Sequence, residues 1–118
     1  MQKLKSNSTR HEVLAASQMG IEFEFYSNLE LKKTQKSLSE LLGRKIQLEE
    51  KAHSDFVPSA DVFKMEPDMS GGAGLIELVT GPMPYRNARL VIVKMLGHRY
   101  LKLNALLLVS LRIQTMCD

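Results

Sequence analysis

The chain contains the stretch Gly20-Ile21-Glu22-Phe23-Glu24-Phe25, in which apolar and acidic side chains alternate. Alternation with a period of two predicts a β-strand, because successive side chains of a strand point to opposite faces of the sheet. The apolar residues then share one face, while Glu22, Glu24 and Tyr26 share the other. The two carboxylates would lie about 7 Å apart along the strand. A half-exposed strand with an ordinary polar face has the same pattern, and this alternative stays open.

A second stretch, Gly74-Leu75-Ile76-Glu77-Leu78-Val79-Thr80, contains one acidic residue in a segment that is otherwise apolar on both faces. Such a strand is typical of the interior of a sheet. An ionised carboxylate there is costly unless it is paired with a cation, bound to a metal or protonated. One alternative is therefore an ion pair with an arginine or a lysine. Because Asp68 precedes this strand and Glu22 and Glu24 lie on another, we instead expect a cluster of carboxylates, a type of site that binds Mg²⁺ or Mn²⁺.

The composition indicates a single globular domain. The chain has 118 residues, of which 44% are hydrophobic, and this is enough for one core. We expect a polar N-terminal arm over residues 1–10 and one domain over residues 11–118. The single cysteine, Cys117, excludes an internal disulfide and a cysteine-rich zinc site within these residues. No apolar run approaches the ~20 residues that a membrane helix needs, so we expect a cytoplasmic protein without a membrane partner.

Positive charge is concentrated in the C-terminal third. Residues 1–77 contain ten Lys and Arg against twelve Asp and Glu, whereas residues 78–118 contain six against one. These cations could neutralise the phosphates of a nucleotide or face a nucleic acid, or they could lie on solvated helix faces. Aromatic residues are not interleaved with them, as they are in proteins that bind single strands. We therefore do not expect a nucleic-acid partner.

The whole sequence predicts an α+β domain with a small, mainly antiparallel sheet and two or three helices. Leucines at helical spacing predict a helix over residues 29–42, with Gly43 as the residue that ends it. A second helix is expected over residues 85–96, ended by Gly97. Residues 98–115 contain neither Gly nor Pro and are compatible with one more helix. Strands are expected at residues 20–26, 45–50, 62–66 and 74–80, and a loop over residues 51–62.

A glycine-rich segment, Ser70-Gly71-Gly72-Ala73-Gly74, connects two of these strands. Glycines allow backbone amides to approach an anion, so phosphate binding by this segment, including Ser70, is one interpretation. The segment lacks the Gly-Lys-Ser/Thr ending and the following helix of a P-loop. A hairpin or a wide turn is therefore the favoured structure.

Three elements, in this order along the chain, resemble the amidoligase family. They are Gly20-Ile21-Glu22-Phe23-Glu24, Asp68-Met69-Ser70 and Glu77-Leu78-Val79-Thr80-Gly81-Pro82. The family pattern is Gly-x-Glu-x-Glu, then Asp-x-Ser, then a strand with Glu, an apolar pair, Thr and a turn that contains Pro. Amidoligases belong to the carboxylate–amine ligase superfamily, together with glutamine synthetase and γ-glutamylcysteine ligase. The resemblance covers the N-terminal part of the family, on residues 20–82 of this chain.

The resemblance implies an antiparallel sheet whose concave face holds divalent metal ions that bridge the phosphates of ATP. Glu22, Glu24 and Glu77 would be the metal ligands, and the metal would be Mg²⁺ or Mn²⁺. Asp68 would lie near the substrate amine or near the metal, as the candidate catalytic residue.

The reaction that the resemblance implies joins a small-molecule carboxylate to an amine at the expense of ATP. The carboxylate is activated as an acyl phosphate, which the amine then attacks. Positioning and electrostatic stabilisation by metal ions would carry the phosphoryl transfer. Ser70, Thr80 and Arg86 are the candidate contacts to the nucleotide.

A later strand of the Gly-x-His-x-His type, which belongs to the family pattern, does not occur after Pro82. We therefore expect this chain alone to be an incomplete ligase, with a partner protein supplying the missing half of the site. A second hypothesis is a non-catalytic structural or metal-binding remnant, of the kind found in phages and other mobile elements. A third is a nucleic-acid-binding module that uses the basic C-terminal third.

Overall fold

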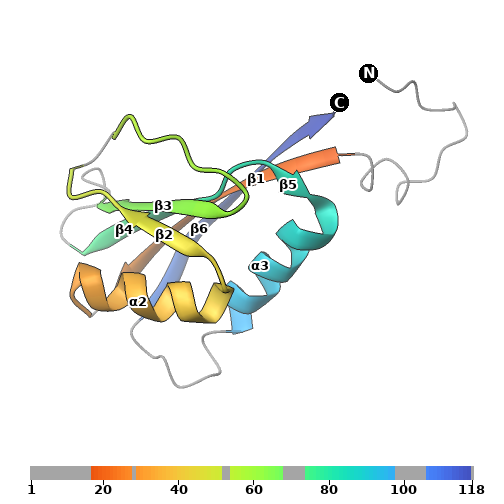
Figure 1. The fold of residues 1–118 in the computed structure, drawn as a ribbon. Helices are drawn as coiled ribbons and strands as arrows, with labels where there is room; N and C mark the ends of the chain where they lie inside the picture. Colours follow the sequence, from red (N-terminus) through yellow and green to blue (C-terminus); the bar gives the residue numbers. More distant parts are fainter. Residues whose placement is uncertain (1–16, 28, 52–53, 68–73, 98–105, 118) are drawn as a thin grey trace, which may run out of the picture.

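The protein has a two-layer α+β fold in which two helices pack on one face of a sheet (Figure 1). The computed structural model describes residues 17–27, 29–51, 54–67, 74–97 and 106–117. Its elements are β1 (Ser17–Ser27), α2 (Leu31–Leu42), β2 (Lys45–Leu48), β3 (Val62–Pro67), β4 (Leu75–Val79), β5 (Met83–Pro84), α3 (Tyr85–Gly97) and β6 (Leu106–Cys117). The expected α+β class is confirmed. The polar arm expected over residues 1–10 lies outside the described residues.

The sheet is antiparallel apart from one pair of strands at its edge. The strands β2, β3, β4 and β1 lie side by side in this order, and β5 also pairs with β1. β6 pairs with β1 along the whole length of β1, from Ser17 to Ser27. Because a strand has two edges, β4 and β5 must share the other edge of β1. β2 and β3 run parallel, and the loop 49–61 provides the crossover of about a dozen residues that a parallel pair requires.

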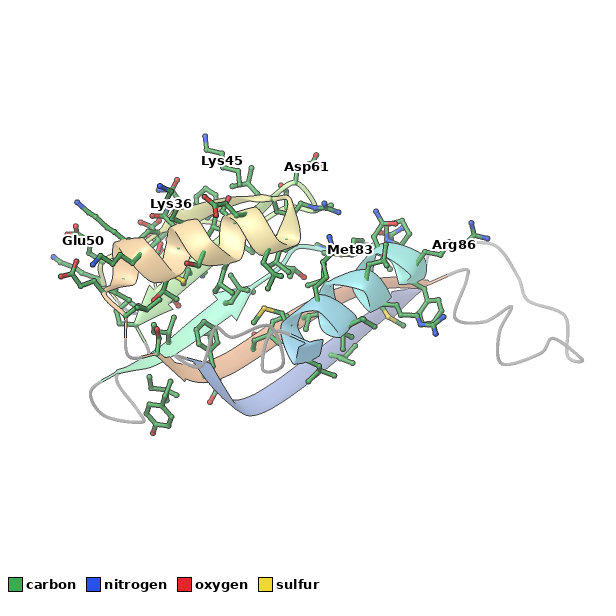
Figure 2. All side chains as sticks on the ribbon, turned by 90° about the horizontal axis from the view of Figure 1, so that it is seen from below. Lys36, Lys45, Glu50, Asp61, Met83 and Arg86 are labelled. Atoms are coloured by element: carbon green, nitrogen blue, oxygen red, sulfur yellow. The ribbon has the colours of Figure 1, made fainter. Side chains whose placement is uncertain are left out.

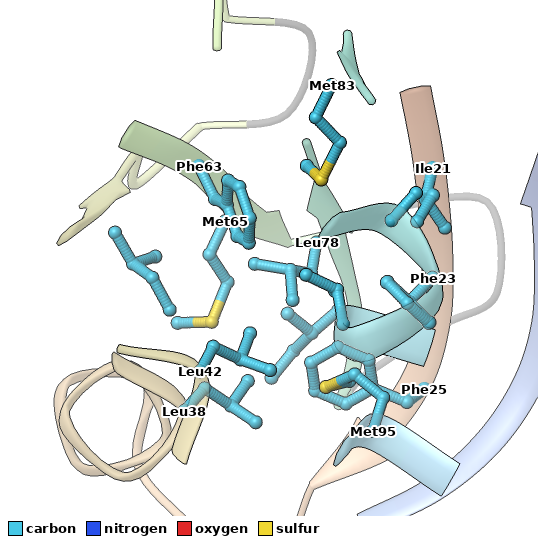
Figure 3. Packing of buried hydrophobic residues seen from close by; sticks show 14 of the residues in the cluster. Ile21, Phe23, Phe25, Leu38, Leu42, Phe63, Met65, Leu78, Met83 and Met95 are labelled. Carbon is cyan, nitrogen blue, oxygen red and sulfur yellow. The ribbon is translucent and has the colours of Figure 1, made fainter. Parts of the chain in front are cut away.

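β1 has the alternation that its sequence predicts. Ile21, Phe23 and Phe25 are buried, and Figure 3 shows them pointing from β1 into the core. Glu22 and Glu24, between them, are partly exposed. One face of β1 is therefore a wall of the hydrophobic core, and the other face carries carboxylates.

The hydrophobic core lies between this face of the sheet and the two helices (Figure 3). Both layers supply buried side chains to it: Leu38 and Leu42 from α2, Ala88, Val91 and Met95 from α3, and Phe63, Met65 and Leu78 from β3 and β4. Burying a side chain of this size stabilises the fold by about 1.5–3 kcal/mol. The core therefore determines which face of each strand turns toward the helices.

Helix α2 ends where its sequence predicts. Gly43 has a φ of 64°, a conformation that glycine adopts without steric cost, and its N–H donates to the carbonyl oxygen of Ser39 at 2.9 Å. At the other end, the Thr34 hydroxyl donates to the carbonyl oxygen of Glu30 at 3.0 Å and lies 2.8 Å from the hydroxyl of Ser27. These bonds attach the start of α2 to the end of β1. No helix in the described part of the chain is long and apolar enough to cross a membrane.

The chain after α3 differs from its sequence expectation. The helix considered over residues 98–115 is wrong where it can be compared, because residues 106–117 form the strand β6. The absence of Gly and Pro, the two residues least favourable to a helix, made this segment compatible with one. However, Leu111, Arg112, Ile113 and Gln114 alternate between apolar and polar residues, which is the period of a strand. The free edge of β1 supplies the pairing partner, and such tertiary context overrides a weak local propensity.

Directly after β4, Gly81 makes a close contact with the backbone of the loop 49–61. The backbone N–H of Thr80 donates to the carbonyl oxygen of Ile21 at 2.9 Å, and the N–H of Gly81 donates to the carbonyl oxygen of Ser59 at 3.1 Å. A Cβ atom on Gly81 would lie 2.5 Å from the Cα atom of Ser59 and 2.7 Å from the carbonyl oxygen of Pro58. The position therefore requires glycine, and it attaches the loop 49–61 to the end of β4.

We expect Gly81→Ala to lower the free energy of unfolding by about 1–3 kcal/mol, since the added methyl group would meet backbone atoms that cannot move without shifting the loop. Gly97→Ala is the matched control, because a Cβ atom there has no neighbour within 4 Å among the residues that the structure describes. That change should be neutral, or stabilising by up to about 1 kcal/mol, in the last turn of a helix. Urea unfolding of both variants measures the difference. Equal stability of Gly81→Ala and the wild type would contradict the close contact.

Candidate metal-binding face of the sheet

Three glutamates lie in a row across three neighbouring strands. Glu66 of β3 is opposite Glu77 of β4, and Glu77 is opposite Glu24 of β1. Residues directly opposite each other in an antiparallel pair share a face, with Cβ atoms about 4.5–5.5 Å apart. Because Phe23 points into the core, the row lies on the face of the sheet away from the helices. We call this face, which also carries Glu22, the glutamate face.

The next row of the glutamate face contains a positively charged side chain. Lys64 of β3 is opposite Val79 of β4, and Val79 is opposite Glu22 of β1. On the other edge of β1, the backbone register places Arg112 opposite Glu22. The face therefore combines carboxylates with at least one ammonium group, and its charge is mixed.

Glu66 is the buried member of the row. Its Oε2 atom accepts a hydrogen bond from the backbone N–H of Ser54 at 3.2 Å and lies 3.8 Å from Nζ of Lys64. The Lys64 side chain is itself 12% exposed. The Ser54 hydroxyl donates to Oε1 of Glu49 at 2.8 Å. The hydrogen bond from Ser54 to Glu66 therefore connects the loop 49–61 to this end of the glutamate face, while the ion pair lies within β3 and the Ser54–Glu49 bond lies within the loop.

The predicted metal ligands Glu22, Glu24 and Glu77 lie on the same face, and all three are partly exposed. Their carboxylate oxygens are the kind of ligand that hard divalent cations prefer. Within the described ranges, no group of three or more His, Cys, Asp or Glu side chains is gathered closely enough to hold a metal ion. To bind a cation, the carboxylates of these neighbouring residues would therefore have to change conformation and turn toward one point. Their role as metal ligands stays a prediction.

Thr80, a predicted contact to the nucleotide, makes structural hydrogen bonds. Its buried hydroxyl oxygen accepts from the backbone N–H of Ile21 at 3.0 Å. The same hydroxyl donates to the carbonyl oxygen of Gly81 at 3.1 Å. Its single hydrogen is thus used within the fold, where it fixes the junction between β1 and the end of β4. Contact with a nucleotide stays a prediction, and these bonds do not support it.

The other predicted residues are not brought to the glutamate face by the described structure. Arg86 lies in the first turn of α3, in the helix layer on the opposite side of the sheet. Figure 2 shows it at the end of the molecule far from Glu50. Asp68 and Ser70 lie outside the described residues, so their predicted roles stay predictions.

Two residues of this face, Lys64 and Glu66, were missed in the sequence. The segment Val62-Phe63-Lys64-Met65-Glu66 alternates as β1 does, and Phe63 and Met65 are buried in the core. The period of two was therefore a sufficient signal that Lys64 and Glu66 share one face. It did not indicate that this face adjoins Glu77, because the pairing of β3 with β4 is not encoded in the alternation.

We expect Glu66→Gln to lower the free energy of unfolding by about 1–2 kcal/mol. The glutamine oxygen can still accept from Ser54, but Lys64 loses its carboxylate, and a largely buried charge without a partner costs about 1–3 kcal/mol or more. The change also removes the repulsion between residue 66 and Glu77 across the strands, which stabilises the fold by about 0.2–1 kcal/mol. The cost of the unpaired Lys64 charge is larger, so the net effect is destabilising. Glu40→Gln on the exposed side of α2 should change stability by less than about 0.5 kcal/mol. Chemical unfolding of both variants is the measurement, and a Glu66→Gln variant as stable as the wild type would refute this role.

No protein-family model matches the chain, and no curated protein or solved structure matches it either. The interpretation of the glutamate face therefore rests on the sequence pattern of this chain and on the register of its strands. The amidoligase resemblance of residues 20–82 remains a hypothesis about the family.

Proposed function

We propose that the glutamate face binds a divalent cation together with ATP, as the nucleotide-binding half of a carboxylate–amine ligase related to the amidoligases. The observation that carries this proposal is the row of Glu66, Glu77 and Glu24 across three strands, with Glu22 beside it. Carboxylates opposite one another in a sheet repel. A divalent cation bound between them would remove this repulsion, and oxygen ligands from adjacent strands suit Mg²⁺ or Mn²⁺.

The position of the resembling elements supports the same proposal. Residues 20–24 and residues 77–82 are far apart in the sequence, yet β1 and β4 pair with Glu24 opposite Glu77. Both helices pack on the other face of the sheet, so no described helix covers the glutamate face (Figure 1). A nucleotide could approach it there without displacing a helix.

The side chains of this face would have separate roles in such a site. Glu22, Glu24 and Glu77 would hold the cation, and Lys64 would add positive charge near the phosphates. A bound divalent cation supplies neutralisation of the phosphate charge during transfer. The substrate carboxylate would take the γ-phosphoryl group as ADP leaves, and the amine would then displace phosphate from the acyl carbon to form the amide.

Calorimetric titration with Mg²⁺–ATP and Mn²⁺–ATP tests the binding step. We expect saturable binding to the wild type and a dissociation constant at least about tenfold higher for Glu24→Gln and Glu77→Gln, since one lost charged ligand costs ~1.4 kcal/mol or more. Glu40→Gln, which changes charge on α2, should bind as the wild type does. Absence of binding by the wild type would overturn the proposal. Binding of the metal alone, with no effect of ATP, would favour a non-catalytic metal-binding protein.

A phosphate-release assay tests whether this chain is a complete enzyme. With Mg²⁺, ATP and a pool of amino acids as carboxylate and amine donors, we expect the chain alone to release no more phosphate than Glu77→Gln does. Phosphoryl transfer requires cationic or metal groups closed around the nucleotide, and the Gly-x-His-x-His element of the family is not found in this sequence. Turnover by the wild type that disappears in Glu77→Gln would show instead that this half-site is sufficient.

A further inference from the structure

Strand β6 lies at the edge of the sheet. It pairs with β1 on one side, and none of the other described strands pairs with its outer edge. The register shifts between Glu24 and Phe25, so Val109 of β6 has no opposite residue, but the pairing from Ser110 to Cys117 is regular. Natural edge strands are commonly protected from association by proline or by several charged residues. β6 contains no proline and one charged residue, Arg112.

An apolar side chain near the middle of this regular segment is exposed. Ile113 is opposite Ile21, so both lie on the face of the sheet that the helices cover. Ile21 is 1% exposed, whereas Ile113 is 45% exposed. The helix layer therefore does not fully cover β6. Helix α3, which packs against the neighbouring strand β1, also has Leu90, Val93 and Leu96 exposed to solvent.

We propose that the outer edge of β6 and Ile113 bind a second copy of this chain, with the two β6 strands antiparallel about a two-fold axis. The backbone N–H and C=O groups of an edge can be satisfied by another extended strand, and an antiparallel pair of identical strands is self-complementary under two-fold symmetry. An axis beside Ile113, near the centre of the regular segment Ser110–Cys117, brings the two Ile113 side chains together. Dimerisation thus pairs the edge and covers the exposed side chain in one step.

This inference does not depend on the proposed nucleotide site. The glutamate face is on the side of the sheet away from Ile113, and the edge lies beyond β1 from β3 and β4. Pairing at β6 would extend the sheet from one copy into the other and leave the row of glutamates accessible in both. The test therefore measures association, with no nucleotide or metal present.

Sedimentation equilibrium of the full chain over a range of concentrations tests the proposal. The wild type should have twice the mass of one 13.3 kDa chain. Ile113→Lys should raise the dimer dissociation constant at least about tenfold, because a charge replaces an apolar side chain at the contact. The matched control is Val57→Lys, since Val57 is 81% exposed in the loop 49–61. This variant should remain as dimeric as the wild type. Hydrogen exchange of the β6 amides should slow as the concentration of the wild type rises.

A wild type that remains monomeric at every concentration would overturn the proposal. An unchanged dissociation constant in Ile113→Lys, equal weakening by Val57→Lys, or exchange of β6 amides that is independent of concentration would also overturn it. Far-UV circular dichroism shows whether Ile113→Lys is folded. If it is not, Ile113→Ser replaces it, with the same expected direction and the same criterion for failure.

Discussion

The register of β1 between β4 and β6 is the constraint on which the rest of the structure depends. A slip of one residue would exchange the faces of β1, placing Glu24 in the core and Phe23 on the other side. Burial of Ile21, Phe23 and Phe25, at about 1.5–3 kcal/mol each, makes such a slip prohibitively costly. The same register sets Glu24 opposite Glu77. The hydrophobic core thus positions the carboxylates, although none of them contributes to it.

Acidic residues can be concentrated on one face of this sheet because their cost is small beside the gain on the other. Like charges opposite each other across two strands cost about 0.2–1 kcal/mol, which is less than the burial of one phenylalanine contributes. Lys64, 3.8 Å from Glu66, offsets part of that repulsion. Most of the stabilising burial is therefore on one face of these strands, and the candidate functional side chains are on the other.

Much of the fold, and half of the glutamate face, follows from local pattern. The period of two in residues 20–25 places Glu22 and Glu24 together, and Gly43 ends α2 because it alone of the neighbouring residues adopts a positive φ without cost. The place of Lys64 and Glu66 beside Glu77 could not be predicted, because alternation indicates which residues share a face but not which strand pairs with theirs. Residues 98–115 are compatible with a helix because they contain neither Gly nor Pro, whereas the open edge of β1 favours a strand over residues 106–117.

Sequence pattern alone is enough to identify most strands, the helix boundary at Gly43 and the two carboxylates of β1, because these depend on interactions between residues close in the chain. Three features depend on the assembled sheet. They are the row of Glu66, Glu77 and Glu24, the ion pair of Glu66 with Lys64, and the strand formed by residues 106–117. Each of these depends on pairing between segments that are distant in sequence. Such pairing is selected by burial of the whole core, and no local pattern encodes it.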